Sequence, residues 1–382
     1  MNLLPLPPRK AAVRESRQRL VCASHFVLER NLRGFPYPSQ ASDAQRAEVF
    51  ARVVSALERL PEPLRPVPVP ADAPPEERED LWMSVFPQEP EPPESGPDTA
   101  LFAGEAFGLR YALGVNQGSH VKIWTATPDA DWNAVSVLLD LLAEKLGDAL
   151  EWAFRPDVGH LTADPERLGT GLGIWVRMHL PGLGLRGILQ ATARGLHELG
   201  FGLRTAHTEE APYRIGGPAE EECGGSPGAL YFLHNLRSGG NGFSEEMLLG
   251  VMNMQARNVM GHEWAARRKA IEDDPRDIAD RISRAAALMG SAYLLSYREA
   301  LDAVSALRLG AEAGILPVRR PEALDALELD LLPYRLRRRF GGTTDVSHRL
   351  RAARATVARD ALQAAGPPPR PRATHPNPKD TP

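Results

Sequence analysis

Residues 160–183 read HLTADPERLGTGLGIWVRMHLPGL, and this stretch contains the pattern that decides the fold. The glycines at its centre predict a turn, because glycine adopts backbone angles that other residues avoid. Apolar residues then alternate with small or polar ones until Pro181, at Ile174, Val176, Met178 and Leu180. A period of two is typical of a strand with one buried face. The segment therefore predicts a turn that leads into a half-buried strand.

Strands and helices interleave on both sides of this segment. Alternation recurs over residues 109–123, where a turn at 116–119 separates two strands. Apolar residues at three-to-four spacing predict helices over 135–154 and 188–199, and a further strand begins at Phe201. Because the strands alternate on one side only, we expect an antiparallel sheet with helices packed on one face.

The chain changes character along its length. Prolines and glutamates gather between residues 61 and 98, and prolines gather again at the C-terminus. From Phe243 onward the pattern is helical. The expected fold is α/β (α+β), with a small helical N-terminal region and a helical C-terminal extension. The expected segments are a helical region at 1–60, a linker or surface insertion at 61–98, a sheet-containing domain at 99–268, the helical extension at 269–362, and a disordered tail at 363–382.

Composition excludes several classes of protein. The formal net charge is -4, with 43% hydrophobic and 25% charged residues, so neither nucleic acid nor an anionic membrane is an expected partner. The chain has no run of about 18 apolar residues, and residues 1–10 lack the apolar core of a signal peptide. Cys22 and Cys223 are too few for a disulfide scaffold and have no neighbours at metal-ligand spacing. We expect a cytoplasmic protein without a metal site.

Five segments, in order, carry a resemblance to a known family. They are LERNLRGFPYP at 28–38, GVNQGSH at 114–120, the quoted stretch at 160–183, LGFGLRTAHTEE at 199–210, and DRISRAAALMGSAYLLSYREALDAVSALRLGAEAGI at 280–315. Together they resemble the ATP:guanido phosphotransferases, and the last is similar to the helical extension of the bacterial protein-arginine kinases. Five blocks in the same order are far more specific than one short motif. The resemblance assigns residues 99–268 to a guanidino-kinase-like catalytic domain.

The resemblance implies a fold and an activity. Members of the family transfer the γ-phosphoryl group of ATP, with Mg, to a guanidinium nitrogen. In the protein-arginine kinases, this nitrogen belongs to an arginine side chain of a protein. Phosphoryl transfer depends on alignment and on cations that stabilise the developing charge. The family uses a cage of arginines for this purpose, together with two glutamates and a reactive cysteine that hold the guanidinium.

Most of the cage positions are substituted in this chain. The first two arginines correspond to His25 and Val27, the third to Lys122 and the fourth to Gly173, whereas the fifth is retained as Arg204. Lysine keeps a charge but loses the bidentate geometry of arginine. Arg167 and Arg177 are nearby substitutes, and Arg167 is the better one, because Arg177 lies four residues beyond Gly173 on the strand.

Most of the residues that would hold the substrate guanidinium are substituted as well. The two glutamates and the aspartate of the family's N-E-E-D-H motif correspond to Gln117, Gly118 and Ser119, while Asn116 and His120 remain in the cleft. Asp164 stands at the cysteine position, and the second catalytic glutamate is retained as Glu209. A carboxylate at position 164 can still pair with a guanidinium.

Two further motifs have a structural interpretation. GTGLG at 169–173 lacks the lysine and hydroxyl of a phosphate loop, so a turn into a strand is the simpler interpretation. His262-Glu263 begins a zinc-protease-like motif, but position 266 is Ala, so we expect an ordinary helix position.

We therefore expect a catalytically impaired protein-arginine-kinase-like protein that regulates or binds a protein partner, through Asp164 and Glu209. One alternative is a divergent active kinase whose ATP contacts come from Arg167, Arg177, Lys122 and Arg204. Another is an adaptor that recruits partners through its proline-rich segments. The sequence leaves a homodimer open.

Overall fold

The computed structural model describes residues 20–85, 96–128, 132–206, 225–239, 243–316, 318, 320, 322–341 and 346–366. The chain divides into two compact units, of which one ends at Ala270 and the other begins at Ile271. The sequence placed this boundary after residue 268.

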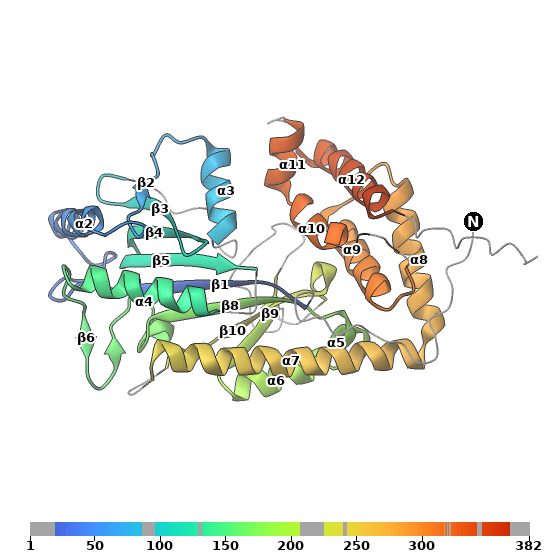
Figure 1. The fold of residues 1–382 in the computed structure, drawn as a ribbon, viewed down its shortest axis with the longest axis horizontal. Helices are drawn as coiled ribbons and strands as arrows, with labels where there is room; N and C mark the ends of the chain where they lie inside the picture. Colours follow the sequence, from blue (N-terminus) through green and yellow to red (C-terminus); the bar gives the residue numbers. More distant parts are fainter. Residues whose placement is uncertain are drawn as a thin grey trace, which may run out of the picture. The chain divides into compact units, whose positions relative to one another are not determined.

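A large antiparallel sheet forms the centre of the first unit (Figure 1). Within the described residues its strand order is β2-β3-β4-β5-β1-β8-β10-β9, and every neighbouring pair is antiparallel. The strands are β1 Val21–Arg30, β2 Val67–Pro68, β3 Ala100–Ala106, β4 Leu109–Gln117, β5 Ser119–Thr127, β8 Leu172–His179, β9 Phe201–Thr205 and β10 Leu230–Asn235. A separate hairpin pairs β6 (Phe154–Arg155) with β7 (Gly159–His160). The antiparallel sheet that the alternation predicted is confirmed.

The central strand β1 lies in the region that was expected to be helical, and this expectation was wrong for residues 21–30. β1 pairs with β5 on one side and with β8 on the other. Its last seven residues are all buried, polar ones included. Apolar and polar residues occur on both faces of β1, so the period-two signal is absent from this segment.

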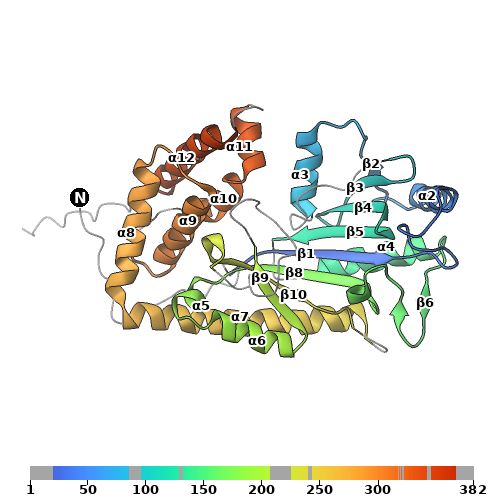
Figure 2. The same cartoon turned by 180° about the vertical axis from the view of Figure 1, so that it is seen from behind.

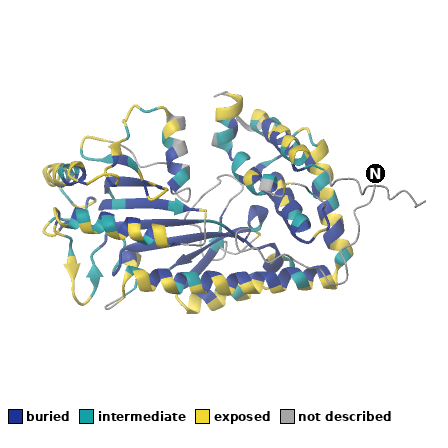
Figure 3. Ribbon diagram, in the orientation of Figure 1, coloured by how far each residue is buried: buried dark blue, intermediate teal, exposed yellow. Residues whose placement is uncertain are grey.

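Helices cover one face of the sheet, which we call the helix face. α4 (Asn133–Gly147) and α7 (Glu245–Asp273) lie on this side in both views (Figures 1 and 2). Phe26 of β1 makes an edge contact with Trp132, just before α4, at 5.4 Å between ring centroids. Buried Arg30 donates from Nη2 to Glu245 at the start of α7. Figure 3 shows that the strands are buried while the outer sides of these helices are exposed.

Part of the proline-rich segment at 61–98 is folded onto the sheet, as an insertion rather than an extended linker. β2 is the edge strand beside β3, and the Val69 N–H donates to Leu101 O beyond the paired residues. α3 (Pro75–Val85) follows, and Trp82 of this helix is only 1% exposed. Residues 86–95 lie outside the described residues.

The remaining helices complete the two units. The first unit also contains α2 (Asp43–Glu58), α5 (Pro181–Leu185) and α6 (Leu189–Glu198). The second unit is helical, with α8 Pro275–Ser291, α9 Tyr297–Glu312, α10 Glu322–Asp330, α11 Pro333–Phe340 and α12 Val346–Ala365. Among the described residues, no helix has both the length and the apolar character that crossing a membrane requires.

Candidate functional site

The face of the sheet opposite the helix face carries the charged side chains, and we call it the cation face. Residues that pair directly across antiparallel strands share a face. The register pairs Glu29 with Lys122, Val27 with Trp124 and Gly173, and His25 with Trp175. It also pairs Phe232 with both Arg177 and Arg204. The family's cage positions on β1, β5, β8 and β9 therefore lie on one surface.

Arg167 occupies the space that a side chain at position 173 would enter. Its guanidinium carbon lies 4.6 Å from the centre of the Trp175 ring, which is close enough for a cation–π contact. A Cβ added to Gly173 would lie 2.9 Å from this carbon and 2.5 Å from the Trp175 ring. The glycine is thus what lets an arginine from another segment reach this position. Among the described residues, Nη1 of buried Arg167 has no hydrogen-bond partner.

The turn before β8 positions Arg167. Asp164 caps the short 3-10 helix η1 (Pro165–Arg167) by accepting from the Glu166 N–H, and its carboxylate lies 4.0 Å from Arg167 Nε. The Asp164 side chain is 46% exposed, so it stays available to a ligand. Gly169 and Gly171 have positive φ, and a Cβ on either would meet backbone within 2.7 Å. These glycines serve a tight turn, as the sequence suggested.

Arg204 lies on β9 with a defined neighbour. Its Nε donates to Nε2 of His234 at 3.1 Å, and Gly202 leaves room for the imidazole ring. Burial, together with Arg204, lowers the pKa of His234 to about 3, so the ring is neutral and can accept this hydrogen bond. Burial also lowers the pKa of Arg167, and nearby Arg204 acts in the same direction, which places both guanidinium groups in one electrostatic environment.

The first two cage positions carry no charge and are covered. Burial, with Arg177 as the second cause, lowers the pKa of His25 to about 3, so this histidine is neutral at pH 7. Val27 lies opposite Trp124, whose ring packs edge-on against Trp82 of α3 at 5.0 Å. The insertion thus places an apolar side chain over this part of the cation face.

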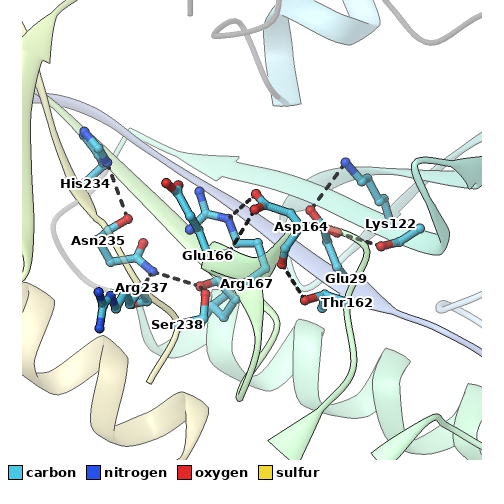
Figure 4. A network of polar contacts seen from close by, with 12 residues as sticks. Glu29, Lys122, Thr162, Asp164, Glu166, Arg167, His234, Asn235, Arg237 and Ser238 are labelled. Atoms are coloured by element: carbon cyan, nitrogen blue, oxygen red, sulfur yellow. Dashed lines mark hydrogen bonds and ion pairs between the residues drawn. The ribbon is translucent and has the colours of Figure 1, made fainter. Parts of the chain in front are cut away.

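Glu29, which the sequence did not single out, brings a carboxylate to the cation face (Figure 4). Its Oε1 lies 3.3 Å from Nζ of Lys122, and its Oε2 accepts from the Ser119 hydroxyl at 2.7 Å. Lys122 is therefore already paired within the chain. The signal was present in the sequence, because Glu29 is the one acidic residue of the β1 segment VCASHFVLER.

Asn116 and His120, expected in the substrate cleft, have structural partners. Asn116 has a positive φ and donates from Nδ2 to two backbone carbonyls, those of Arg46 and Asp98. His120 is 1% exposed, and its Nδ1 accepts from the Leu32 N–H while Nε2 contacts Pro36 O. Both ring nitrogens are therefore occupied by backbone. Glu209, the retained glutamate, lies outside the described residues.

Two family models match the chain over separate regions. Residues 109–215 match the C-terminal catalytic domain of the ATP:guanido phosphotransferases. Residues 275–373 match the C-terminal domain of the protein-arginine kinase McsB. The first region contains the strands of the cation face from β4 to β9, and the second contains the helices of the second unit.

Curated relatives and solved structures agree with these matches. The chain is 30% identical over 265 residues to a protein-arginine kinase of Exiguobacterium, covering 69% of this chain and 71% of that one. It is 24% identical over 326 residues to a protein-arginine kinase of Halothermothrix orenii, covering 84% and 87%.

The fold itself is that of guanidino kinases. A crystal structure of lombricine kinase matches with a TM-score of 0.50 at 17% identity, over 71% of this chain and 75% of that one. The duplicated taurocyamine kinase of Schistosoma mansoni matches with a TM-score of 0.51 at 18% identity, over 78% and 42%. The sequence matches, the antiparallel sheet of the first unit and the helices of the second unit together show that the chain belongs to the protein-arginine kinase family of ATP:guanido phosphotransferases.

Proposed function

We propose that this chain is a catalytically impaired member of its family that keeps the kinase scaffold and acts by binding a protein. The observation that carries the proposal is the state of the first two cage positions. His25 is buried and neutral, and Val27 is an uncharged side chain that pairs across the sheet with Trp124, against which Trp82 packs. A phosphoryl-transfer site needs preorganised positive charge at such positions, and losing one such group costs several kcal/mol of barrier lowering.

The residues present do not fit a Mg-bound triphosphate. Lys122 is paired with Glu29, and the Glu29 carboxylate would repel phosphate oxygens at this end of the face. The insertion helix α3 reaches this face through Trp82, which packs against Trp124. Arg167 and Arg204 remain, together with Arg177, but they line only the β8–β9 side of the sheet.

The proposed partner is a protein that presents an arginine or phosphoarginine side chain. The half-exposed carboxylate of Asp164 can accept a guanidinium, and Glu209 is the second carboxylate assigned to this role by the family resemblance. The curated relatives carry the name protein-arginine kinase, which supports protein arginine as the group recognised. The use of only two cysteines supports a reducing, cytoplasmic location.

A divergent but active kinase is the second candidate, and one observation favours it. The Arg167 guanidinium lies within 2.9 Å of the position where residue 173 would begin its side chain, so a cation is supplied there from another segment. With Arg204 and Arg177 on the same face, three guanidinium groups line the β8–β9 side.

The deciding experiment offers labelled ATP with Mg to the purified chain, with an arginine-rich protein as acceptor. We expect no transfer at rates typical of kinases, about 1–100 per second. We also expect no thermal shift at millimolar Mg-ATP, whereas saturation at a hundred times the dissociation constant would add about 2.7 kcal/mol. Transfer at such rates that Glu209→Ala abolishes would establish the active kinase instead.

A further inference from the structure

Glu29 is held in place on the cation face by three neighbouring groups. Its side chain is 5% exposed, and Lys122 Nζ and the Ser119 hydroxyl each contact one of its carboxylate oxygens. Asn31 Nδ2 donates to the same Ser119 hydroxyl at 3.2 Å. Because that hydroxyl has a single proton and already accepts from Asn31, its proton goes to Glu29. The arrangement fixes the carboxylate in one orientation.

The carboxylate faces the cations that a phosphate chain would need. The Glu29 carboxylate interacts electrostatically with the charges of both Lys122 and Arg167. Lys122 Nζ in turn lies 3.5 Å from the point where a Cβ at Gly118 would be. The carboxylate that partners Lys122 comes from the neighbouring strand β1 (Figure 4). Position 118 is a glycine and contributes no side chain.

Resting on the proposed function, we propose that Glu29 is a specificity-determining residue, which admits a single phosphoryl group to the cation face and excludes a polyphosphate. Arg167 and Arg204, on the β8–β9 side, supply the forked donors that one phosphoryl group requires. A longer phosphate chain that extends toward Lys122 meets the negative charge of Glu29 at a site with little water.

A purely structural ion pair between β1 and β5 would predict a different behaviour. Removing such a pair lowers stability but leaves the affinity for anions unchanged. Removing a built-in competitor raises the affinity for polyphosphate, because Lys122 becomes available and the repulsion is lost. The two readings are separated by measuring binding and unfolding on the same variants.

The test compares Glu29→Gln with Glu166→Gln in the full chain, using tripolyphosphate and orthophosphate as probes in calorimetry at low ionic strength. Glu166 is a matched control, because it is exposed and also lies in the field of Arg167. We expect Glu29→Gln to tighten tripolyphosphate binding by about tenfold or more and to change orthophosphate binding by less than about threefold. Glu166→Gln should leave both affinities within about threefold.

A second substitution tests the role of Lys122. In a Lys122→Gln background, Glu29→Gln should no longer tighten tripolyphosphate binding, because the cation that it releases is gone. Equal gains in Glu29→Gln and Glu166→Gln, or no gain in either, would overturn the proposal. If Glu29→Gln fails to fold, the unmodified chain decides, since tripolyphosphate that binds more than about a hundredfold tighter than orthophosphate contradicts an excluded polyphosphate.

This outcome is separable from that of the proposed function. Phosphoryl transfer from ATP by the unmodified chain would contradict both, because ATP is itself a polyphosphate. If the unmodified chain shows no transfer and Glu29→Gln does not bind tripolyphosphate more tightly, the proposed function stands and this inference is wrong.

Discussion

The Glu263 carboxylate lies 2.5 Å from Nε of Arg267, and neither side chain is exposed to solvent at all. The same carboxylate accepts the N–H groups of Gly182 and Leu183 at the start of α5, and Arg267 Nη2 donates to His179 O at the end of β8. This pair connects the long helix α7 to the strand that supports Arg167 and Gly173. Residue 263, which begins a protease-like motif in the sequence, therefore has a structural role.

Glu263→Ala should lower the free energy of unfolding by about 3–5 kcal/mol, because it leaves a buried guanidinium and two buried N–H groups without their acceptor. Urea unfolding measures the change. His262→Ala is the control, since His262 is exposed on the same helix and should change stability by less than about 0.5 kcal/mol. A loss below about 1 kcal/mol in Glu263→Ala would show that this pair does not hold α7.

Gly173→Ala and Gly195→Ala should change stability in opposite directions. The added methyl group at 173 would meet the Trp175 ring and Arg167, so we expect a loss of about 1–3 kcal/mol. Gly195 lies in α6 with nothing within 4 Å of the new Cβ, so alanine should stabilise by about 0.5–1 kcal/mol. Thermal unfolding of both variants checks the pair. If Gly173→Ala is neutral, Arg167 does not occupy this space.

Trp82→Ala tests whether the insertion is part of the core. The side chain is buried against Trp124, so we expect destabilisation by about 3–5 kcal/mol. Leu199→Ala, at a side chain that is 61% exposed, should have little effect. An unchanged urea midpoint for Trp82→Ala would show that the segment is a linker rather than part of the core. That result would favour the adaptor that recruits partners through its proline-rich segments.

Stability should fall as the pH drops below about 6.5. Burial, the leading cause in each case, lowers the pKa values of His25, His160 and His234 to about 3 in the folded chain, while the unfolded chain has the ordinary value of 6.5. Between these values the unfolded state binds more protons, so each histidine removes up to roughly 1.4 kcal/mol per pH unit as the pH falls. Urea midpoints at pH 7.5, 5.5 and 4.5 measure the slope. His160→Gln should reduce this slope. If single substitutions of His25, His160 and His234 all leave the slope unchanged, the buried histidines are not its cause.

The elements that the sequence predicted are those whose residues follow the period of their backbone. Alternation indicated β4, β5 and β8, although all eight residues of β8 are buried, and three-to-four spacing indicated α4, α6 and α7. The strand β1 and the insertion helix α3 are among the elements that were not predicted. The first mixes apolar and polar residues on both faces, and the second follows a proline-rich stretch that resembles a linker.

The candidate site was also predicted only in part, because some roles follow from the sequence pattern and others depend on contacts between distant residues. The sequence marked Arg167 as the better substitute for the missing arginine, and the structure places its guanidinium beside Gly173. It also marked Asn116 and His120 as cleft residues, although backbone groups occupy both. Glu29 was overlooked because its role depends on Lys122 and Ser119, which are distant in sequence and adjacent only across the sheet.

The prolines around β2 give this end of the sheet an unusual outer rim. Val67 and Val69 turn their N–H groups toward β3, so the alternating residues Pro66, Pro68 and Pro70 face outward. Proline has no N–H to offer, and this rim therefore presents carbonyl groups without donors. A strand from another molecule would find no N–H donors for a ladder there, so the segment protects this edge of the described sheet from edge-to-edge aggregation.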